Sequence, residues 1–373
     1  MSNKRIQIPD PIETTGWSNN TPSVPLTHDL AIFIGRFQCG HNAHIQTIID
    51  SLKVAKKVLV IFGSAYQPRT YKNPWNVVER EEMLTLALEE RGVNMDRIVF
   101  RSNVDTRYTD GAWLVRTQNI VNELVEDIND PKIVVVGHQK NADPSTFYLK
   151  MFPQWDRLDH QLMEPLDATD IRAHYFQRNA NLNFLKGVVP PAIINYLTEW
   201  RNTEGFETVM AEREFSIEYK RPYAGLPYDI IFKTADAVVV QNGHVLLIKR
   251  RALPGKGLWA FPGGFVNAKT DRSVLAAAIR ELREETKLKV PEPVLIGNIQ
   301  EEHEFDAIDR SSRGRIITTA FYITLPNGDE LPKVKGSDDA EKAKWVPIAD
   351  VKSEECFEDH FEILEYFVGT IGE

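Results

Sequence analysis

The sequence predicts an α/β protein of two domains, an N-terminal doubly wound parallel sheet followed by an α+β domain with mainly antiparallel strands. From Asp29 onward, short β-branched runs alternate with amphipathic stretches, which is the pattern of a parallel sheet covered by helices on both faces. After Tyr228 the pattern changes to hairpin signals. The length of 373 residues matches about two domains of ordinary size.

In the first domain, buried runs and helical periodicity define the elements in order. Glycines follow three of the strands, at Gly35, Gly63 and Gly137. Since ligands bind at the carboxyl ends of the strands in such sheets, these turns mark the expected site. The predicted strands are 30–34, 58–62, 98–100 and 133–136, and the predicted helices are 43–53, 77–90, 112–125 and 192–200.

In the second domain, Asn242-Gly243 separates two alternating runs at 235–241 and 245–249, which predicts a hairpin. A Gly- and Pro-rich loop, one helix and a strand at 315–323 follow. The boundaries predicted are an extended or disordered arm over 1–28, domains over 29–200 and 228–373, and a charged connector over 201–227.

Composition excludes several classes of protein. Acidic residues outnumber basic ones by 53 to 44, giving a net charge of −9, so a broad nucleic-acid surface is not expected. Two distant cysteines, Cys39 and Cys356, form neither a disulfide framework nor a zinc pattern. No apolar run approaches the ~20 residues of a membrane helix, and residues 1–28 lack a signal-peptide core. We expect a cytoplasmic protein without membrane partners and leave a homo-oligomer open.

Two segments of the first domain carry phosphate chemistry. Gly35-Arg36-Phe37 leads into His41 and His44 at the start of a helix, where imidazoles and free amides can meet phosphates. Thr169 and Arg172 lie at another predicted helix start, and an arginine fork suits the same anions. Alone, each segment also fits a surface turn or an ordinary helix cap. The presence of both segments in one parallel-sheet domain favours nucleotide binding.

The first segment resembles the GxFxPxHxGH signature of the nucleotidylyltransferases, and residues 166–172 resemble their ISxTxxR signature. The resemblance implies a Rossmann-like domain that moves an adenylyl group from ATP to an acceptor phosphate without a covalent intermediate. Cys39, Ala43 and Asp167 depart from the pattern, where proline, glycine and serine are usual. The residues it implies for ATP are Gly35, Arg36, Phe37, His41, His44, Gly137, His138, Thr169 and Arg172, with His41, His44 and Arg172 catalytic.

Two further stretches of sequence indicate which molecule accepts the adenylyl group. Asn73-Pro74-Trp75 with Arg80, and the segment 108–113 ending at Trp113, resemble nicotinamide mononucleotide (NMN) adenylyltransferases. The resemblance implies NMN binding by Asn73, Arg80 and Trp113, with the indole stacking on the cationic pyridinium. Core packing is the plainer explanation of Trp113. Another phosphorylated cofactor precursor remains the alternative acceptor.

The helix of the second domain places three carboxylates on one face. Glu281, Glu284 and Glu285 are spaced i, i+3, i+4, and carboxylate oxygens suit a hard cation such as Mg²⁺ (or Mn²⁺). A solvated charged helix would show the same residues. With the preceding Gly263-Gly264, the segment resembles the Nudix box, which implies metal binding by Gly264, Glu281, Glu284 and Glu285 and catalysis by the glutamates.

This box departs from the Nudix pattern at three points. Two residues are inserted between Gly264 and Arg280, Arg272 stands where the loop glutamate is expected, and Lys287 replaces a late glycine. A non-catalytic nucleotide sensor is therefore the alternative to a hydrolase. Arg310, Arg313 and Arg315 precede a strand as in the ADP-ribose-selective branch and are the implied ADP-ribose ligands.

Both resemblances, in this order, match the bifunctional NMN adenylyltransferase/Nudix hydrolases. The family implies NAD synthesis from ATP and NMN, with release of pyrophosphate, and metal-dependent hydrolysis of ADP-ribose to AMP and ribose 5-phosphate. The expected partners are these small molecules.

Overall fold

The computed structural model describes residues 26–137, 148–159, 168–337, 340–369 and 371. Contacts divide the chain into two units. The first comprises Met1–Phe62, Val78–Arg101 and Val121–Glu199, and the second comprises Gly63–Val77, Ser102–Ile120 and Trp200–Glu373. Of the predicted arm over 1–28, only the last three residues are described, and His28 already begins a strand.

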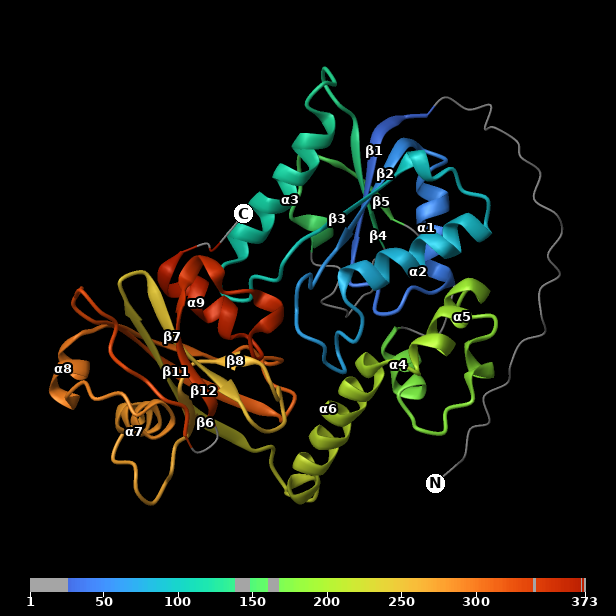
Figure 1. Ribbon diagram of the computed structural model, residues 1–373. Helices are drawn as coiled ribbons and strands as arrows, with labels where there is room; N and C mark the ends of the chain where they lie inside the picture. The colour runs from blue at the N-terminus through green and yellow to red at the C-terminus, as the bar shows by residue number, and fades with distance from the viewer. Residues whose placement is uncertain (1–25, 138–147, 160–167, 338–339, 370, 372–373) are drawn as a thin grey trace. The chain divides into compact units, whose positions relative to one another are not determined.

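The first unit is built on a parallel sheet that has five strands within the described residues, in the order β3-β2-β1-β4-β5. β1 is central and buried, and it pairs with β2 on one side and β4 on the other. Figure 1 shows α1 and α2 on one face of this sheet. In chain order, the elements from His28 to Trp200 are β1 His28–Gly35, α1 Asn42–Ser51, β2 Ala55–Phe62, α2 Val77–Glu90, η1 Met95–Arg97, β3 Ile98–Ser102, α3 Asp110–Val125, β4 Ile133–Gly137, β5 Asp156–Asp159, α4 Ala168–Tyr175, η3 Leu182–Leu185 and α5 Pro191–Trp200. Most of α3 belongs to the second unit.

These elements confirm the predicted doubly wound sheet. Helix α2 begins and ends at the predicted residues, because its buried positions repeat at helical spacing. Two differences stand out. The short strand β5 was not predicted, since its four residues carry no apolar run. Thr169 lies inside the first turn of α4 and not before it, because the helix already begins at Ala168.

The second unit contains a mixed sheet of seven strands within the described residues, with the main order β10-β11-β6-β7-β12. Its pairings are antiparallel except for that of β11 with β6. The elements are α6 Glu204–Lys220, η4 Arg221–Tyr223, β6 Ile231–Gln241, β7 His244–Arg250, β8 Trp259–Ala260, β9 Gly263–Phe265, α7 Val274–Thr286, α8 Glu292–Gly297, β10 Ile299–Phe305, β11 Arg315–Thr324, β12 Ala340–Pro347, η5 Ile348–Asp350, η6 Ser353–Glu355 and α9 His360–Val368.

The predicted hairpin is present between β6 and β7. Asn242 and Gly243 both have positive φ angles, 48° and 71°, which is the backbone that a two-residue hairpin turn requires. The connector predicted over 201–227 is largely the helix α6. Only Phe206, Val209 and Met210 of that helix are buried, so its sequence lacks a strong apolar stripe.

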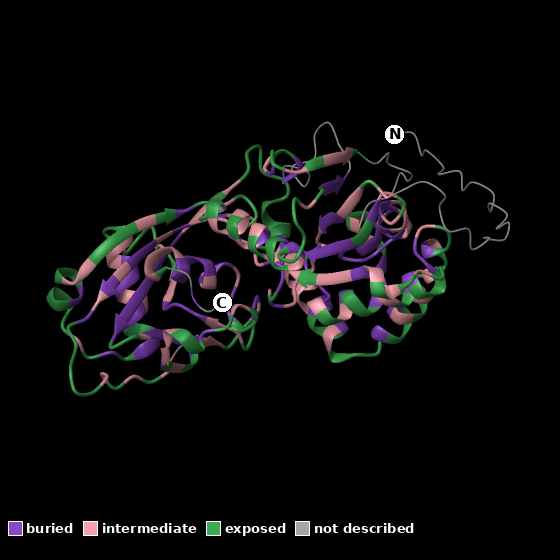
Figure 2. Ribbon diagram, turned by 90° about the horizontal axis from the view of Figure 1, so that it is seen from above, coloured by how far each residue is buried: buried purple, intermediate pink, exposed green. Residues whose placement is uncertain are grey.

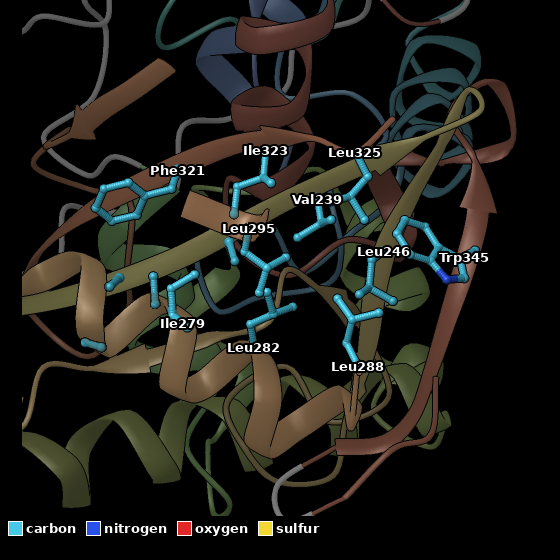
Figure 3. Packing of buried hydrophobic residues seen from close by; sticks show 14 residues of the cluster. Val239, Leu246, Ile279, Leu282, Leu288, Leu295, Phe321, Ile323, Leu325 and Trp345 are labelled. Atoms are coloured by element: carbon cyan, nitrogen blue, oxygen red, sulfur yellow. The ribbon is translucent and has the colours of Figure 1, made fainter. Parts of the chain in front are cut away.

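Helix α7 lies on one face of this sheet and α9 on the other. Figure 3 shows Ile279 and Leu282 of α7 directed toward strand residues that include Val239 and Phe321. The opposite face holds a second cluster in which Ile363 of α9 joins residues such as Val238 of β6. Alternate residues of β6 face opposite sides, and the strand is buried on both from Thr234 to Gln241. Figure 2, coloured by burial, shows buried strand segments in the interior of the fold. This packing fixes the glutamate-bearing face of α7.

Candidate functional site

The turn between β1 and α1 is closed by an aromatic ring. The ring of Phe37 lies against Gly35, where an added Cβ would come within 3.0 Å of the Phe37 Cζ. Phe37 also meets His44 edge-on, with ring centroids 4.9 Å apart. Glycine at 35 therefore allows the Phe37 ring to approach the backbone closely, and a Cβ there would require the ring to shift.

The two signature histidines lie together at the start of α1. His41 is the N-cap residue, and its ring stacks on that of His44 with centroids 3.7 Å apart. The backbone N–H of His41 donates to Nδ1 of His44 over 3.4 Å. The pair thus stands beside the amides of a helix N-terminus, where the helix dipole favours an anion.

The second signature converges on the same turn. Arg172, from α4, donates to the backbone carbonyl of Gln38 and, over 3.3 Å, to Oγ1 of Thr169. Its neighbour Cys39 is fully buried, and burial raises the pKa of that thiol to about 12 although Arg172 opposes the shift. Cys39, which replaces the usual proline, is therefore a neutral packing residue here. Asp167, the third departure, lies outside the described residues.

Arg80 and Arg36 are linked beside this turn. Arg80 is buried, donates to the carbonyl oxygen of Arg36 over 2.7 Å and places its guanidinium over the ring of Phe62. Nη1 of Arg36 is buried and has no hydrogen-bond partner within the described residues. Gly137 ends β4 against Leu149, and His138 lies outside the described part of the chain.

The two remaining residues expected at the acceptor site belong to the second unit. Asn73 is buried, and its Oδ1 has no hydrogen-bond partner among the described residues. Trp113 is only partly buried, and its carbonyl oxygen accepts hydrogen bonds from Asn103 and Thr117. Partial exposure distinguishes Trp113 from Trp75, which is fully buried against Trp200.

Two of the three glutamates of α7, Glu281 and Glu285, lie against the Gly263-Gly264 strand β9. Oε2 of Glu285 accepts a hydrogen bond from the N–H of Gly263 over 2.9 Å. The Glu281 carboxylate fills the space beside Gly264, where an added Cβ would lie 2.6 Å from Oε1. Glu284 is more exposed and accepts from Nη1 of Arg280 over 3.1 Å.

Burial, and to a smaller extent neighbouring acids, raises the pKa values of the carboxyl groups here. Burial, reinforced by the charges of Glu281 and Asp236, raises the pKa of Glu285 to about 8. Burial likewise raises the pKa of Asp236 to about 6, although Thr318 donates a hydrogen bond to it. The pKa of Glu281 is raised mainly by burial and also by Glu284. Carboxyl groups crowded in a low-dielectric setting favour a bound cation.

In the lengthened loop before Arg280, where the expected glutamate is absent, Asp271 supplies a carboxylate. Arg280 donates through Nε and Nη2 to both oxygens of Asp271, at 2.9 and 2.8 Å. This bonding lowers the pKa of Asp271 to about 2. Asp271 therefore supplies a carboxylate from the lengthened loop to the box arginine. Lys287 ends α7 with a φ of 51°, which is why glycine is usual at this position.

The three predicted ADP-ribose arginines differ in their surroundings. Arg310 is buried, and its Nε and Nη2 donate to Asp359 over 2.9 and 2.8 Å, so its guanidinium is directed into the fold. Arg313 pairs with Glu358 and lies over the rings of Phe265 and Phe357. Arg315 is partly exposed and donates to the carbonyl of Asp306.

Comparisons with known proteins agree with this geometry. A cytidylyltransferase-like family model matches residues 32–174, and a NUDIX domain model matches residues 232–367. The nicotinamide/nicotinic acid mononucleotide adenylyltransferase of Acinetobacter baylyi is 32% identical over 47% of this chain and 88% of its own. The ADP-ribose pyrophosphatase of Methanocaldococcus jannaschii is 33% identical over 30% of this chain and 60% of its own.

The deciding comparison spans both domains. The crystal structure of a bifunctional NMN adenylyltransferase/ADP ribose pyrophosphatase from Francisella tularensis superimposes with a TM-score of 0.84 at 31% identity, covering 92% of this chain and 100% of that one. The chain belongs to this bifunctional family. A second Francisella structure of the same kind holds AMP and a manganese ion, with a TM-score of 0.83.

A related structure of this family holds a manganese ion. The question for this chain is therefore whether the glutamates of α7 could bind a divalent cation. Among the described residues, no three His, Cys, Asp or Glu side chains converge closely enough to hold a metal as they stand. The donor chemistry still fits, because Glu281, Glu284 and Glu285 offer carboxylate oxygens, and the charges of Glu281 and Asp236 act on Glu285. Arg280 donates hydrogen bonds to Glu281 and Glu284.

Sequence reasoning missed several charged residues around the hydrolase site. Asp236 has the clearest signal, a carboxylate inside an otherwise apolar strand run. Arg250 lies over the Phe357 ring, 4.0 Å from its centroid, and its charge acts on Glu285. The stretch 358–360 fits the family pattern in the sequence, but no periodicity gives Glu358 and Asp359 a role, and a turn places them beside Arg313 and Arg310.

Within the described part of this family member, no helix is both long enough and apolar enough to cross a bilayer.

Proposed function

We propose that residues 29–200 form a nucleotidylyltransferase domain that makes NAD and pyrophosphate from ATP and NMN. The observation that carries this is the convergence of Arg172 on the turn that presents His41 and His44. The buried Nη1 of Arg36, which lacks a partner among the described residues, supports an anionic ligand at the same turn. The ATP-binding residues proposed are Gly35, Arg36, Phe37, His41, His44, Gly137, His138, Thr169 and Arg172.

In this reaction an oxygen of the NMN phosphate attacks the α-phosphorus of ATP and pyrophosphate leaves. His41 and His44 donate to the phosphates from the N-terminus of α1, and Arg172 holds the β/γ end together with Thr169. Because no covalent intermediate forms, these residues act by alignment and by stabilising developing negative charge.

NMN binding is proposed for Asn73 and Trp113, with Arg80 fixing the turn through the Arg36 carbonyl. Oδ1 of Asn73 is buried and has no hydrogen-bond partner among the described residues, so it could accept a hydrogen bond from the ligand. The partly exposed indole of Trp113 offers a face to the cationic pyridinium.

We further propose that residues 228–373 hydrolyse ADP-ribose to AMP and ribose 5-phosphate. Glu281, Glu284, Glu285 and the Gly264 carbonyl would hold Mg²⁺ (or Mn²⁺), which when bound polarises the diphosphate and lowers the pKa of water. Arg313 and Arg315 are the proposed partners of the substrate phosphates. Arg310, whose Nε and Nη2 donate to Asp359, would shape the loop that carries them.

The remaining boundaries are proposed as an arm over 1–28 and a connector over 201–227. The family matches at 32–174 and 232–367 fall inside the two proposed domains and support them.

One set of assays tests both activities on the full chain. ATP with NMN should yield NAD and pyrophosphate, whereas other phosphorylated cofactor precursors should react poorly. ADP-ribose should be cleaved with Mg²⁺ or Mn²⁺ and not in a chelator. A protein that binds ADP-ribose without cleaving it, with either metal, would be a sensor and would disprove the hydrolase proposal.

A further inference from the structure

Two segments of the cytidylyltransferase-like match belong to the second unit, 63–77 and 102–120. They carry Asn73 and Trp113, the residues proposed to bind NMN. Both segments are tied by charged groups to the C-terminal part of that unit. Lys72 pairs with Asp309, and Arg116 pairs with Glu365 of α9 over 3.3 Å.

The strongest of these ties are made by Arg107 and Glu362. The guanidinium of Arg107 pairs with Oε1 of Glu362, and the backbone N–H of Arg107 donates to Oε2 over 2.9 Å. The side chain of Glu362 is only 4% exposed. Since one carboxylate holds both the main chain and the side chain of Arg107, the path of the segment is fixed at that residue.

Tyr108 makes the adjacent tie. Its hydroxyl donates to Oδ2 of Asp359, and its ring meets Phe305 edge-on with centroids 4.7 Å apart. Asp359 is fully buried and also accepts the two hydrogen bonds from Arg310. Asp359 therefore joins the loop of the ADP-ribose arginines to the segment of the acceptor site.

Local hydrogen bonds connect the anchored Tyr108 to Trp113 and so restrict the position of Trp113. The N–H of Thr109 donates to the carbonyl of Thr106, and that of Ala112 donates to the carbonyl of Thr109. The buried side chain of Asn103 donates to the carbonyl of Trp113 over 3.2 Å. The segment from 103 to 113, which runs into the first turn of α3, is thus connected by hydrogen bonds and has charged anchors along it.

The positive and negative partners of these ion pairs are divided in the same way in each pair. The three ion pairs that tie these segments, Lys72–Asp309, Arg107–Glu362 and Arg116–Glu365, each have the cation in the segments near Asn73 and Trp113 and the anion in the C-terminal part. Arg107–Glu362 is the most buried of the three, with side chains 17% and 4% exposed, and a buried ion pair can fix register and orientation without adding net stability. A positioning role follows for the anions.

We propose that Asp359 and Glu362 of the hydrolase domain are positioning residues for the NMN site, holding the segment Tyr108–Trp113, which leads into α3, in its binding conformation. This inference rests on the proposed synthesis of NAD. It makes NMN affinity depend on the fold of the second domain, while the hydrolytic glutamates of α7 are not required.

The test uses two variants of the full chain, Tyr108→Phe and Glu362→Gln. Tyr108→Phe keeps the ring that packs on Phe305 and removes only the bond to Asp359. Glu362→Gln keeps an acceptor for the Arg107 N–H and removes the charge. The matched control is Glu354→Gln, at an exposed position just before α9. For each we would measure the KM of NMN, the KM of ATP, kcat, ADP-ribose hydrolysis and the melting temperature.

We expect the KM of NMN to rise about fivefold or more in both variants, with the KM of ATP, kcat and ADP-ribose hydrolysis within about twofold of wild type. Glu354→Gln should match wild type. An unchanged KM for NMN in both variants would overturn the positioning role, as would equal rises for NMN and ATP with a lower melting temperature. Wild-type protein that forms no NAD would instead refute the underlying function.

Discussion

Replacing Glu285 by glutamine tests the assignment of the hydrolase site most directly. The side chain is 5% exposed, and one oxygen accepts from the N–H of Gly263. Glutamine keeps the shape and an acceptor for that N–H, but it removes the charge. Because the glutamate is expected to bind metal, ADP-ribose hydrolysis should fall by about a hundredfold or more while NAD synthesis persists.

The same substitution should change how stability depends on pH. Burial and neighbouring acids raise the pKa of Glu285 from 4.5 to about 8 in the folded protein. Between these values the folded state binds a proton that the unfolded state has released, so the metal-free wild type loses stability as pH rises from 4.5 to 8. At about 1.4 kcal/mol per pKa unit, the loss is on the order of 5 kcal/mol.

The assay is thermal melting in a chelator at pH 4.5, 7 and 9, repeated with Mg²⁺. In the chelator, Glu285→Gln should match wild type at pH 4.5 and exceed it increasingly toward pH 9. A bound cation replaces the proton, so Mg²⁺ should raise the melting temperature of wild type more at pH 9 than at pH 4.5. The variant should gain little from Mg²⁺.

Two results would refute this reasoning. If Glu285→Gln hydrolysed ADP-ribose at the wild-type rate, the assignment of Glu285 to the hydrolase site would be wrong. Melting temperatures of wild type and variant that differ by the same amount at all three pH values would show that the carboxyl is not perturbed by burial.

Three further substitutions test other parts of the structure. His44→Ala should reduce kcat for NAD synthesis by about a hundredfold with ADP-ribose hydrolysis intact, because the imidazole stabilises phosphate charge at the start of α1; a normal rate of synthesis would disprove that role. Trp113→Ala should raise the KM of NMN about 5- to 100-fold and leave that of ATP unchanged, since stacking on an aromatic ring is worth about 1–3 kcal/mol; equal losses for both ligands with a lower melting temperature would identify a packing residue. Burial lowers the pKa of His360 from 6.5 to about 3, so wild type should lose stability as pH falls from 6.5 toward 3. His360→Asn, whose oxygen can accept from the Phe261 N–H as Nδ1 now does, should flatten that dependence by several kcal/mol, on the order of 1.4 per pKa unit, and an unchanged slope in denaturation curves would contradict the assignment.

The sequence by itself determined the two folds and most of their elements. Helix α2 runs from Val77 to Glu90 as predicted, and the hairpin turns at Asn242-Gly243. Such features are local, because side-chain periodicity records which face is buried and φ preferences record where the chain turns. The residues of both signatures could be named for the same reason, since each lies within one short stretch.

Only the tertiary structure decided which charges meet. Arg310 pairs with Asp359, 49 positions away, and Arg107 pairs with Glu362, 255 positions away. Contacts likewise place 63–77 and 102–120 in the second unit, although the pattern of the sequence runs through them without a break. Propensity and periodicity act over a few residues, whereas an ion pair across the chain depends on how whole elements pack, and no local pattern records that.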